Sequence, residues 1–357
     1  GQDSLGTLTT ANNNTALGYS SGLSLTTGTG NVFMGHGAGD SVTTANQNTI
    51  IGAFAGQDLT DQSANTFLGE EAGQNTIGEA NTFLGAFAGE NTNDVDRCIG
   101  IGRAAMLGVD GSTSGNNNIA IGFNSMLAVT TGVQNISIGN TSLDAMTTGD
   151  NNTCLGHNTM SSLTTGGSNT AIGAFALDAN TTASNNTAVG VDALGANTTG
   201  QNNVAVGANT LDANTTGAFN TSLGQGSMTS NTTGSDSVAV GYFALSTATT
   251  GGQNSALGYL ALQDVTTATG NTGIGYQAGK DITTGTNNTF IGNNSGIAQT
   301  TATDNTAVGH ATLAANTSGN GLVAVGSNCL DANTTGSNNT AIGRSALGAN
   351  TTGTQNV

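Results

Sequence analysis

The chain has 357 residues, of which 56 are glycine and only 7% are charged, and it contains neither proline nor tryptophan. A formal net charge of −17 with four basic residues excludes the basic surface that nucleic acids and anionic membranes require. The sequence contains no apolar stretch of about 18 residues, the length that a transmembrane helix requires. The cysteines, Cys98, Cys154 and Cys329, are too far apart to predict a disulfide framework or metal site, and we expect them to be small buried side chains.

A glycine in a motif of the type Asn-Thr-Ala-Ile-Gly recurs along the whole chain. It occurs twenty times, from Gly18 to Gly343, and seventeen of the nineteen intervals are 17 residues long. The interval from Gly69 to Gly85 is 16 residues. A repeat of this length indicates an architecture built from one short unit stacked many times.

The interval from Gly102 to Gly122 is the longest, at 20 residues. Its extra residues fall within 106–117, which is rich in turn-forming residues, namely Gly108, Asp110, Gly111 and Gly115. Glycine and aspartate favour turns, so we expect the insertion to bulge at a corner of the repeat.

The consensus repeat is N-T-A-[I/V/L]-G-x-x-A-L-x-x-x-T-T-G-x-N, and we number its positions 1 to 17, so that the recurring glycine is position 5. This length is too short for a helix pair or a propeller blade, and Thr, Val and Ile favour strands. The pattern predicts an all-β parallel β-solenoid (β-roll) of about 21 coils with two short strands per coil. Residues 1–357 should form a single repeat domain.

Both ends of the sequence cut a coil, and neither end shows an atypical capping coil. Uncapped solenoid ends expose unpaired strand edges. We therefore expect the native protein to continue beyond both ends as part of a longer fibre.

Position 4 is aliphatic in all twenty coils that carry the recurring glycine. A column of this kind predicts side chains stacked in the interior of the coils. We expect this core ladder to include Ile51, Ile121, Ile172, Val206, Ile291 and Ile342.

Positions 3 and 9 vary together. Where position 3 is small, position 9 is usually Leu or Met, whereas five coils have a large residue at position 3 and glycine at position 9. These pairs are Phe33 and Gly39, Ile50 and Gly56, Phe67 and Gly73, Phe83 and Gly89, and Phe290 and Gly296. Close-packed interiors tolerate an exchange of volume but not overpacking, so both positions should fill one shared space.

Positions 3 and 4 are neighbours in a strand and must point to opposite faces, although both are apolar. One face fills the coil, and the other must be covered. A partner chain is the simplest cover, which predicts self-association as a homotrimer around a central axis, or end to end in a fibre. A wider single-chain coil that buries both faces is the alternative.

Two further columns should line the surface or the corners. Position 1 is nearly always Asn, which predicts a hydrogen-bonded corner ladder. Position 6 holds all four tyrosines, and Tyr242, Tyr259 and Tyr276 occupy successive coils, so we expect a short exposed aromatic ladder. Such a ladder either stiffens the stack or binds a ligand such as a cell-surface glycan.

Positions 13 and 14 are commonly Thr-Thr, as in Thr181-Thr182 and Thr215-Thr216. A flat Thr array can order water, which raises ice binding as a hypothesis. Adjacent residues of a strand point to opposite faces, so only one of the two columns should reach solvent.

The run from Asn169 to Leu177, repeated from Asn339 to Leu347, resembles the repeats of phage tail-fibre and related surface-fibre proteins and, less closely, the head repeats of trimeric autotransporter adhesins. The resemblance covers essentially the whole chain. It implies a trimeric, fibrous, extracellular protein at a cell surface or on a virion, whose function is that of a structural shaft or an adhesin. The adhesin heads use shorter coils.

No convergent set of titratable residues stands out from the repeat, so we expect neither an enzyme nor a cofactor or metal site.

Overall fold

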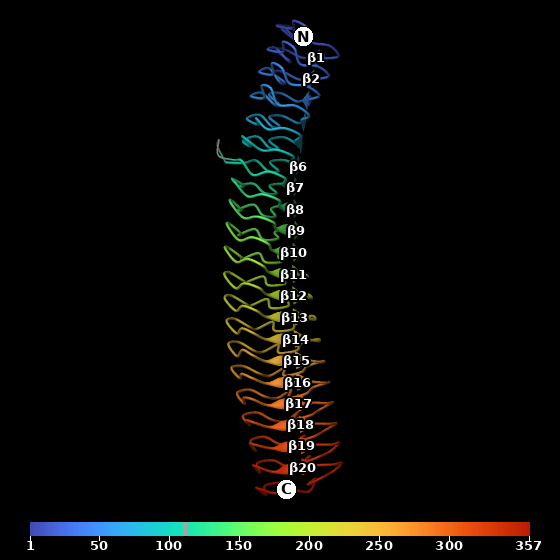
Figure 1. The fold of residues 1–357 in the computed structure, drawn as a ribbon, viewed down its shortest axis with the longest axis vertical. Helices are drawn as coiled ribbons and strands as arrows, with labels where there is room; N and C mark the ends of the chain where they lie inside the picture. The colour runs from blue at the N-terminus through green and yellow to red at the C-terminus, as the bar shows by residue number, and fades with distance from the viewer. Residues whose placement is uncertain (110–112) are drawn as a thin grey trace. The chain divides into compact units, whose positions relative to one another are not determined.

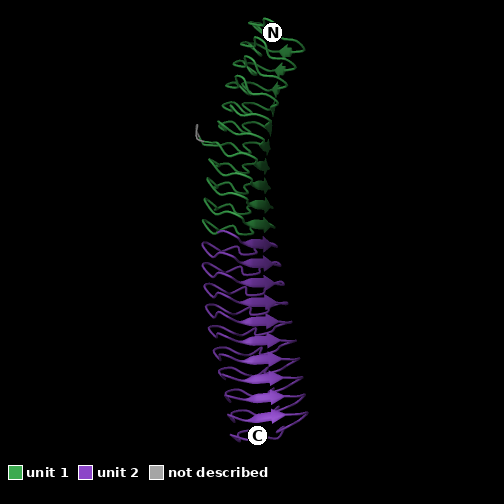
Figure 2. Cartoon of the chain, in the orientation of Figure 1, with its two compact units in different colours: residues 1–183 green, residues 184–357 purple. Residues whose placement is uncertain are grey.

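The computed structural model describes residues 1–109 and 113–357, and the chain divides into two compact units, residues 1–183 and 184–357 (Figure 2). Asp110 and Gly111 of the expected insertion lie outside the described residues. Each unit is a parallel β-solenoid in which one three-residue strand follows another in chain order, one strand per coil (Figure 1). The described residues include no helix.

The first unit contains ten strands: β1 (Thr15–Leu17), β2 (Val32–Met34), β3 (Thr49–Ile51), β4 (Thr66–Leu68), β5 (Thr82–Leu84), β6 (Ile99–Ile101), β7 (Ile119–Ile121), β8 (Ile136–Ile138), β9 (Thr153–Leu155) and β10 (Thr170–Ile172). Each strand covers positions 2 to 4 of its coil. Successive strands pair in parallel with matched positions opposite each other, as in Ala16 opposite Phe33.

The second unit contains ten more: β11 (Thr187–Val189), β12 (Val204–Val206), β13 (Thr221–Leu223), β14 (Val238–Val240), β15 (Ser255–Leu257), β16 (Thr272–Ile274), β17 (Thr289–Ile291), β18 (Thr306–Val308), β19 (Val323–Val325) and β20 (Thr340–Ile342). The register again repeats, with Ala188 opposite Ala205. The predicted parallel β-solenoid is therefore confirmed.

The prediction of two strands per coil is wrong, because the backbone leaves the extended conformation at several positions. In the coil that begins at Asn152, Gly156 at position 5 has φ 146°, and Asn158, Met160 and Ser168 at positions 7, 9 and 17 have φ values of 50°, 49° and 59°. Residues with positive φ cannot continue a strand. The rest of the coil consequently consists of turns, bends and irregular segments.

Hydrogen bonds nevertheless join neighbouring coils on every side. On the strand side the Val204 N–H donates to the carbonyl of Asn220 over 2.8 Å. On the Thr-Thr side the Thr215 N–H donates to the Thr232 carbonyl over 2.9 Å. A coil thus has most of its main-chain polar groups satisfied by the coils above and below it, as burial of the interior requires.

The interior is lined by position 3 of each strand together with positions 8, 9, 12 and 15 of the turns. Phe33, Phe67, Phe83 and Phe290, all at position 3, are fully buried. The cysteines are also buried and free, as expected of small apolar side chains.

The predicted core ladder is wrong: position 4 points outward. Ile172, Ile291 and Ile342 are exposed by 38, 37 and 72%, and the other three predicted members, Ile51, Ile121 and Val206, are only half-buried. The physical reason is strand alternation. Position 3 faces inward toward the side chains of positions 8 and 9, so position 4 must face the other way.

The shared space of positions 3 and 9 is confirmed. A Cβ atom added to Gly296 would lie 2.5 Å from ring carbons of Phe290, and one on Gly39 would lie 2.5 Å from the Phe33 ring. The ring therefore occupies the volume that a position 9 leucine fills elsewhere.

The interior space that positions 3 and 9 fill is also shared between neighbouring coils. Gly273 and Gly279 make both positions of one coil small, and a Cβ on Gly279 would lie 2.7 Å from both Leu262 in the coil before and Phe290 in the coil after. Large side chains of the two neighbours fill the space that this coil leaves.

The predicted Asn ladder at position 1 is confirmed and is fully buried. Asn48 donates from Nδ2 to the Asn31 Oδ1 over 3.2 Å, and its main-chain N–H donates to the same oxygen over 3.0 Å. The Nδ2 also donates to the Gln62 carbonyl of its own coil over 3.0 Å, and the Oδ1 accepts the Asn65 N–H of the next coil over 2.9 Å. Each amide therefore joins three coils, a stronger role than stacking alone.

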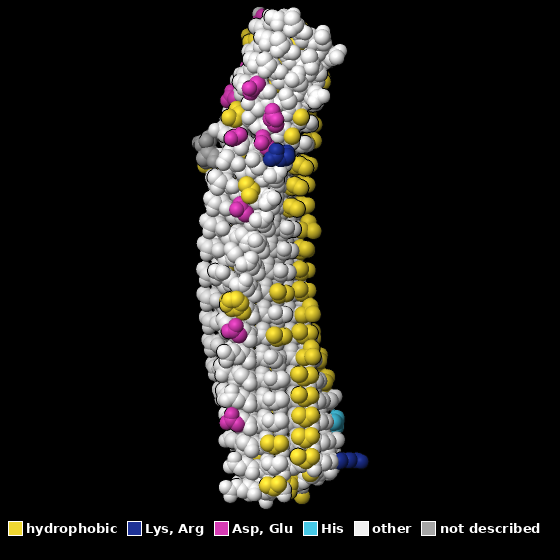
Figure 3. All heavy atoms as spheres, in the orientation of Figure 1, with side chains coloured by type: hydrophobic (Ala, Val, Ile, Leu, Met, Phe, Trp, Pro, Cys, Tyr) yellow, Lys and Arg dark blue, Asp and Glu magenta, His cyan; other side chains and the backbone are white. Residues whose placement is uncertain are grey.

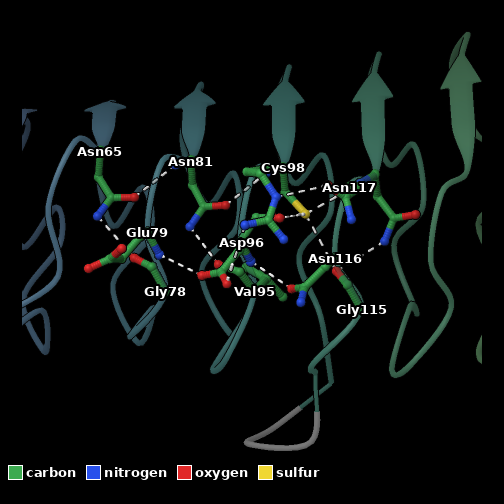
Figure 4. A network of polar contacts seen from close by, with 12 residues as sticks. Asn65, Gly78, Glu79, Asn81, Val95, Asp96, Cys98, Gly115, Asn116 and Asn117 are labelled. Carbon is green, nitrogen blue, oxygen red and sulfur yellow. Dashed lines mark hydrogen bonds and ion pairs between the residues drawn. The ribbon is translucent and has the colours of Figure 1, made fainter.

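Cys98 replaces Asn in this ladder (Figure 4). Its N–H donates to the Asn81 Oδ1 over 2.9 Å, its thiol donates to the Gly115 carbonyl over 3.4 Å, and Sγ accepts the Asn118 N–H over 3.5 Å. Burial raises the pKa of this thiol to about 11. The side chain thus maintains the ladder as a neutral thiol with low nucleophilic reactivity.

A second Asn column, not anticipated from the sequence, lies at position 12. Asn214 donates to the Asn197 Oδ1 over 2.8 Å, and Asn231 donates to the Asn214 Oδ1 over 2.9 Å. The column then stops at Ala248, and the buried Asn231 Oδ1 has no hydrogen-bond partner among the described residues. An unsatisfied buried acceptor costs about 1–3 kcal/mol.

Ala248→Asn should therefore stabilise the second unit. The introduced amide can donate to the Asn231 Oδ1 and extend the column, with an expected gain of about 1 kcal/mol. Thermal unfolding followed by circular dichroism measures the gain as a higher midpoint. In an Asn231→Ala background the same substitution should lose this gain, and a persistent gain would contradict the hydrogen-bond explanation.

The two coils of unusual length differ from the others on the same side. In the 16-residue coil Asn65 donates to the Gly78 carbonyl 13 residues away, whereas the matching separation is 14 for Asn48 and Gln62. The residue is therefore missing from the Thr-Thr segment. In the 20-residue coil Thr113 is buried, and the regular hydrogen bonds to the neighbouring coils resume at this residue. The extra residues therefore follow Gly108.

Candidate interaction surfaces

In each unit a column of aliphatic side chains lies on the outer face of the strands. It consists of position 4 of every coil, and we call it the position 4 column. Its members in the first unit are Leu17, Met34, Ile51, Leu68, Leu84, Ile101, Ile121, Ile138, Leu155 and Ile172. In the second unit they are Val189, Val206, Leu223, Val240, Leu257, Ile274, Ile291, Val308, Val325 and Ile342. None of the twenty is buried.

Position 2 points to the same face and adds to this surface. It is usually Thr, but Ile136, Val204, Val238 and Val323 make it aliphatic and are exposed. Figure 3 shows the hydrophobic side chains gathered in a continuous column on this face of each unit. A monomeric soluble protein seldom exposes a contiguous apolar strip of this kind.

The predicted tyrosine ladder is present as a stack of rings. The ring centroids of Tyr242 and Tyr259 are 5.6 Å apart with planes inclined by 6°, and those of Tyr259 and Tyr276 are 5.2 Å apart and inclined by 8°. Each side chain is 44 to 46% exposed. Both faces of Tyr259 are directed at a neighbouring ring, so solvent reaches the ring edges and hydroxyl groups of this stack.

Other side chains at positions 6 and 7 also stack between coils. Tyr19 packs on His36, whose ring in turn contacts Phe54. The Arg103 guanidinium lies between the Phe87 and Phe123 rings, 5.4 and 5.8 Å from their centroids. These contacts favour a stacking role for the edge that positions 6 and 7 form.

The Thr-Thr segment exposes one column, as expected. The position 13 hydroxyls are bound to the next coil, with Thr215 Oγ1 donating to the Thr232 carbonyl over 3.0 Å. Position 14 is exposed and is Thr in most coils of the second unit, including Thr216, Thr233 and Thr250. A single column of hydroxyls orders water in one direction only, which gives ice binding weak support.

The titratable groups of the described residues form no convergent site. Within residues 1–109 and 113–357 no group of three His, Cys, Asp or Glu side chains is placed to hold a metal ion, and no pocket is found. Nor does any helix of sufficient length and apolar character to cross a membrane occur in that part of the chain.

Aspartates at position 10 are the acidic groups that the fold perturbs. Burial raises the pKa of Asp40, Asp144 and Asp212, and the nearby carboxylate of Asp178 raises that of Asp144 further. The Asp144 Oδ1 is buried with no hydrogen-bond partner among the residues described. The folded state therefore binds a proton at these groups more tightly than the unfolded state does.

Stability should accordingly rise on acidification. A raised folded-state pKa contributes stability that is complete below the unfolded pKa of about 4 and is lost as the pH rises through the folded pKa. Asp144→Asn should increase the unfolding midpoint at pH 7 and leave it unchanged well below pH ~4. Asp236→Asn, at an exposed position, is the control for the change in net charge, and an equal gain from it would contradict this explanation.

The fold and these surfaces define the chain as a β-solenoid repeat protein. No protein-family model and no curated protein sequence matches it.

Proposed function

We propose that the chain is the structural shaft of an extracellular fibre, at a cell surface or on a virion, in which copies associate side by side through the position 4 column. The observation that carries this proposal is the aliphatic side chain on the outer face of every strand, which forms a column in each unit. Burying such side chains contributes about 1.5–3 kcal/mol each. The extracellular setting rests on the resemblance of the repeat to those of surface fibres.

A further copy of the same chain is the partner that fits this column. The column repeats once per coil, at a rise of about 4.8 Å, and any partner must present apolar groups with that period over the same length. A second copy does so by construction. Because the column is one side chain wide and flanked by position 2, mostly Thr, three copies around a central axis would bury it most simply as a homotrimer.

The test is to make the column polar without changing its shape. Threonine is close in size to valine and retains strand propensity, so a triple variant should fold but associate more weakly, by about tenfold or more per substitution. The three substitutions are Val206→Thr, Val240→Thr and Val308→Thr. Light scattering measures the mass, and circular dichroism reports on the fold.

The matched control changes three exposed side chains on another side of the same unit. Its substitutions are Thr216→Ser, Thr250→Ser and Thr301→Ser, and we expect the mass of the unsubstituted chain. A monomeric mass for the unsubstituted protein would overturn side-by-side association. Equal dissociation of both variants would show that the column is not the contact.

A second candidate function is an adhesin that binds surface glycans directly, which the exposed stack of Tyr242, Tyr259 and Tyr276 favours. Solvent reaches the hydroxyl groups of this stack, and sugars exchange hydrogen bonds with phenol hydroxyls. A glycan array probed with the protein and with its triple Tyr→Ala variant tests this function. Binding that the variant retains would remove the tyrosine stack from consideration.

A further inference from the structure

The second unit contains three tyrosine rings that are both stacked and reachable from solvent. Tyr242, Tyr259 and Tyr276 occupy position 6 of consecutive coils, with centroids 5.6 and 5.2 Å apart and planes nearly parallel. The fourth tyrosine, Tyr19, packs on His36 instead, with the two rings tilted by 50°. Three tyrosines of the chain are therefore neighbours of one another, whereas Tyr19 lies beside a histidine.

We propose that this stack is a site of oxidative tyrosine coupling, at which a dityrosine bond joins Tyr259 to Tyr242 or Tyr276 and links adjacent coils covalently. The proposal is independent of the assembly and glycan-binding proposals above, because it needs only the geometry within one chain.

The chemistry requires a one-electron oxidant, supplied from outside as a peroxidase with hydrogen peroxide. Each of two phenols loses one electron and one proton from its hydroxyl group, and the two phenoxyl radicals couple through ring carbons ortho to oxygen. The two coupled carbons then lose their hydrogens as protons while the two oxygens regain protons. The products are one carbon–carbon bond and, from one hydrogen peroxide, two water molecules.

The structure favours this step in two ways. Coupling needs two radicals in contact, and rings held in adjacent coils have a high effective concentration toward each other. The side chains are 44 to 46% exposed, so an oxidant can reach their edges, and coupling requires two rings to turn from the stacked arrangement until their ortho carbons meet. Consecutive coils hold the attachment points about 4.8 Å apart, a span within reach of a linked ring pair.

The test treats the full chain with peroxidase and hydrogen peroxide, then measures dityrosine fluorescence, the mass of the denatured chain, and the linked peptides after proteolysis. We expect a cross-link within a single chain, with the loss of one pair of hydrogen atoms, that maps to Tyr259 and one neighbour. The cross-linked product should also unfold at a higher temperature, because the bond restricts the unfolded chain.

Two conservative variants separate the stack from general tyrosine oxidation. Tyr259→Phe keeps a stacked ring but leaves Tyr242 and Tyr276 two coils apart, and it should lower the dityrosine yield by about tenfold or more. Tyr19→Phe is the matched control and should leave the yield unchanged. Three results would overturn the proposal: linkage only between chains, an undiminished yield from Tyr259→Phe, or no linkage where free tyrosine couples.

Discussion

Gly139→Ala should be among the most damaging single substitutions in the protein. Gly139 occupies position 5 with φ 150°, and a Cβ there would lie 2.0 Å from the Gly156 carbonyl oxygen of the next coil. The φ value alone costs a residue with a side chain about 1–3 kcal/mol, and the contact with backbone forces two coils apart. We expect a loss of about 4 kcal/mol or more, seen as a lowered unfolding midpoint.

Gly343→Ala separates the two causes. Gly343 has a comparable φ of 126°, but the nearest atom to its added Cβ is the Ala346 Cβ, 4.0 Å away. It should therefore show the conformational cost alone, about 1–3 kcal/mol. If both variants lose the same stability, contact between coils does not explain why glycine recurs at position 5.

Exchanging the volumes of Phe290 and Gly296 should have the next largest effect. Phe290→Ala alone removes a fully buried ring and should cost about 3–5 kcal/mol. Gly296→Leu alone overpacks, because its Cβ would lie 2.5 Å from the ring, and should cost about 1–3 kcal/mol or more.

The double variant Phe290→Ala with Gly296→Leu recreates the Ala and Leu pairing of most coils and should recover most of the loss. Some deficit should remain, because Phe290 also fills space beside Gly279 in the preceding coil. Unfolding midpoints of the four proteins in the cycle measure this coupling. Additive losses would show that the two positions do not share one space.

The repeat predicts the solenoid because its period is too regular and too short for any other arrangement, and the exchange of volume between positions 3 and 9 predicts their contact. The same exchange also indicated which strand face lies inside. Position 3 changes size in step with position 9 because both belong to the interior. Position 4 is uniform for another reason, since it forms a column on the outer surface, so uniform aliphatic character alone does not predict burial.

The number of strands per coil was harder to predict. Leucine and methionine at position 9 adopt φ near 50°, as Leu177 and Met160 do, although such residues rarely have positive φ. Hydrogen bonds to the next coil hold them there, and propensity does not report that. The position 12 column was predictable in principle, because Asn180, Asn197, Asn214 and Asn231 recur at the coil period.

Both departures from the 17-residue period lie after the buried side chains of positions 8 and 9 and before the Gly or Ala of position 15. In the 17-residue coils the side chains of positions 13 and 14 point partly or wholly to water, so gain or loss of a residue there disturbs fewer buried contacts than elsewhere in the coil. A change of one residue within the strand at positions 2 to 4 would instead exchange its inward and outward side chains. In-frame insertions and deletions in the gene should thus persist at this segment alone, while whole-coil duplications lengthen the protein without a new interface.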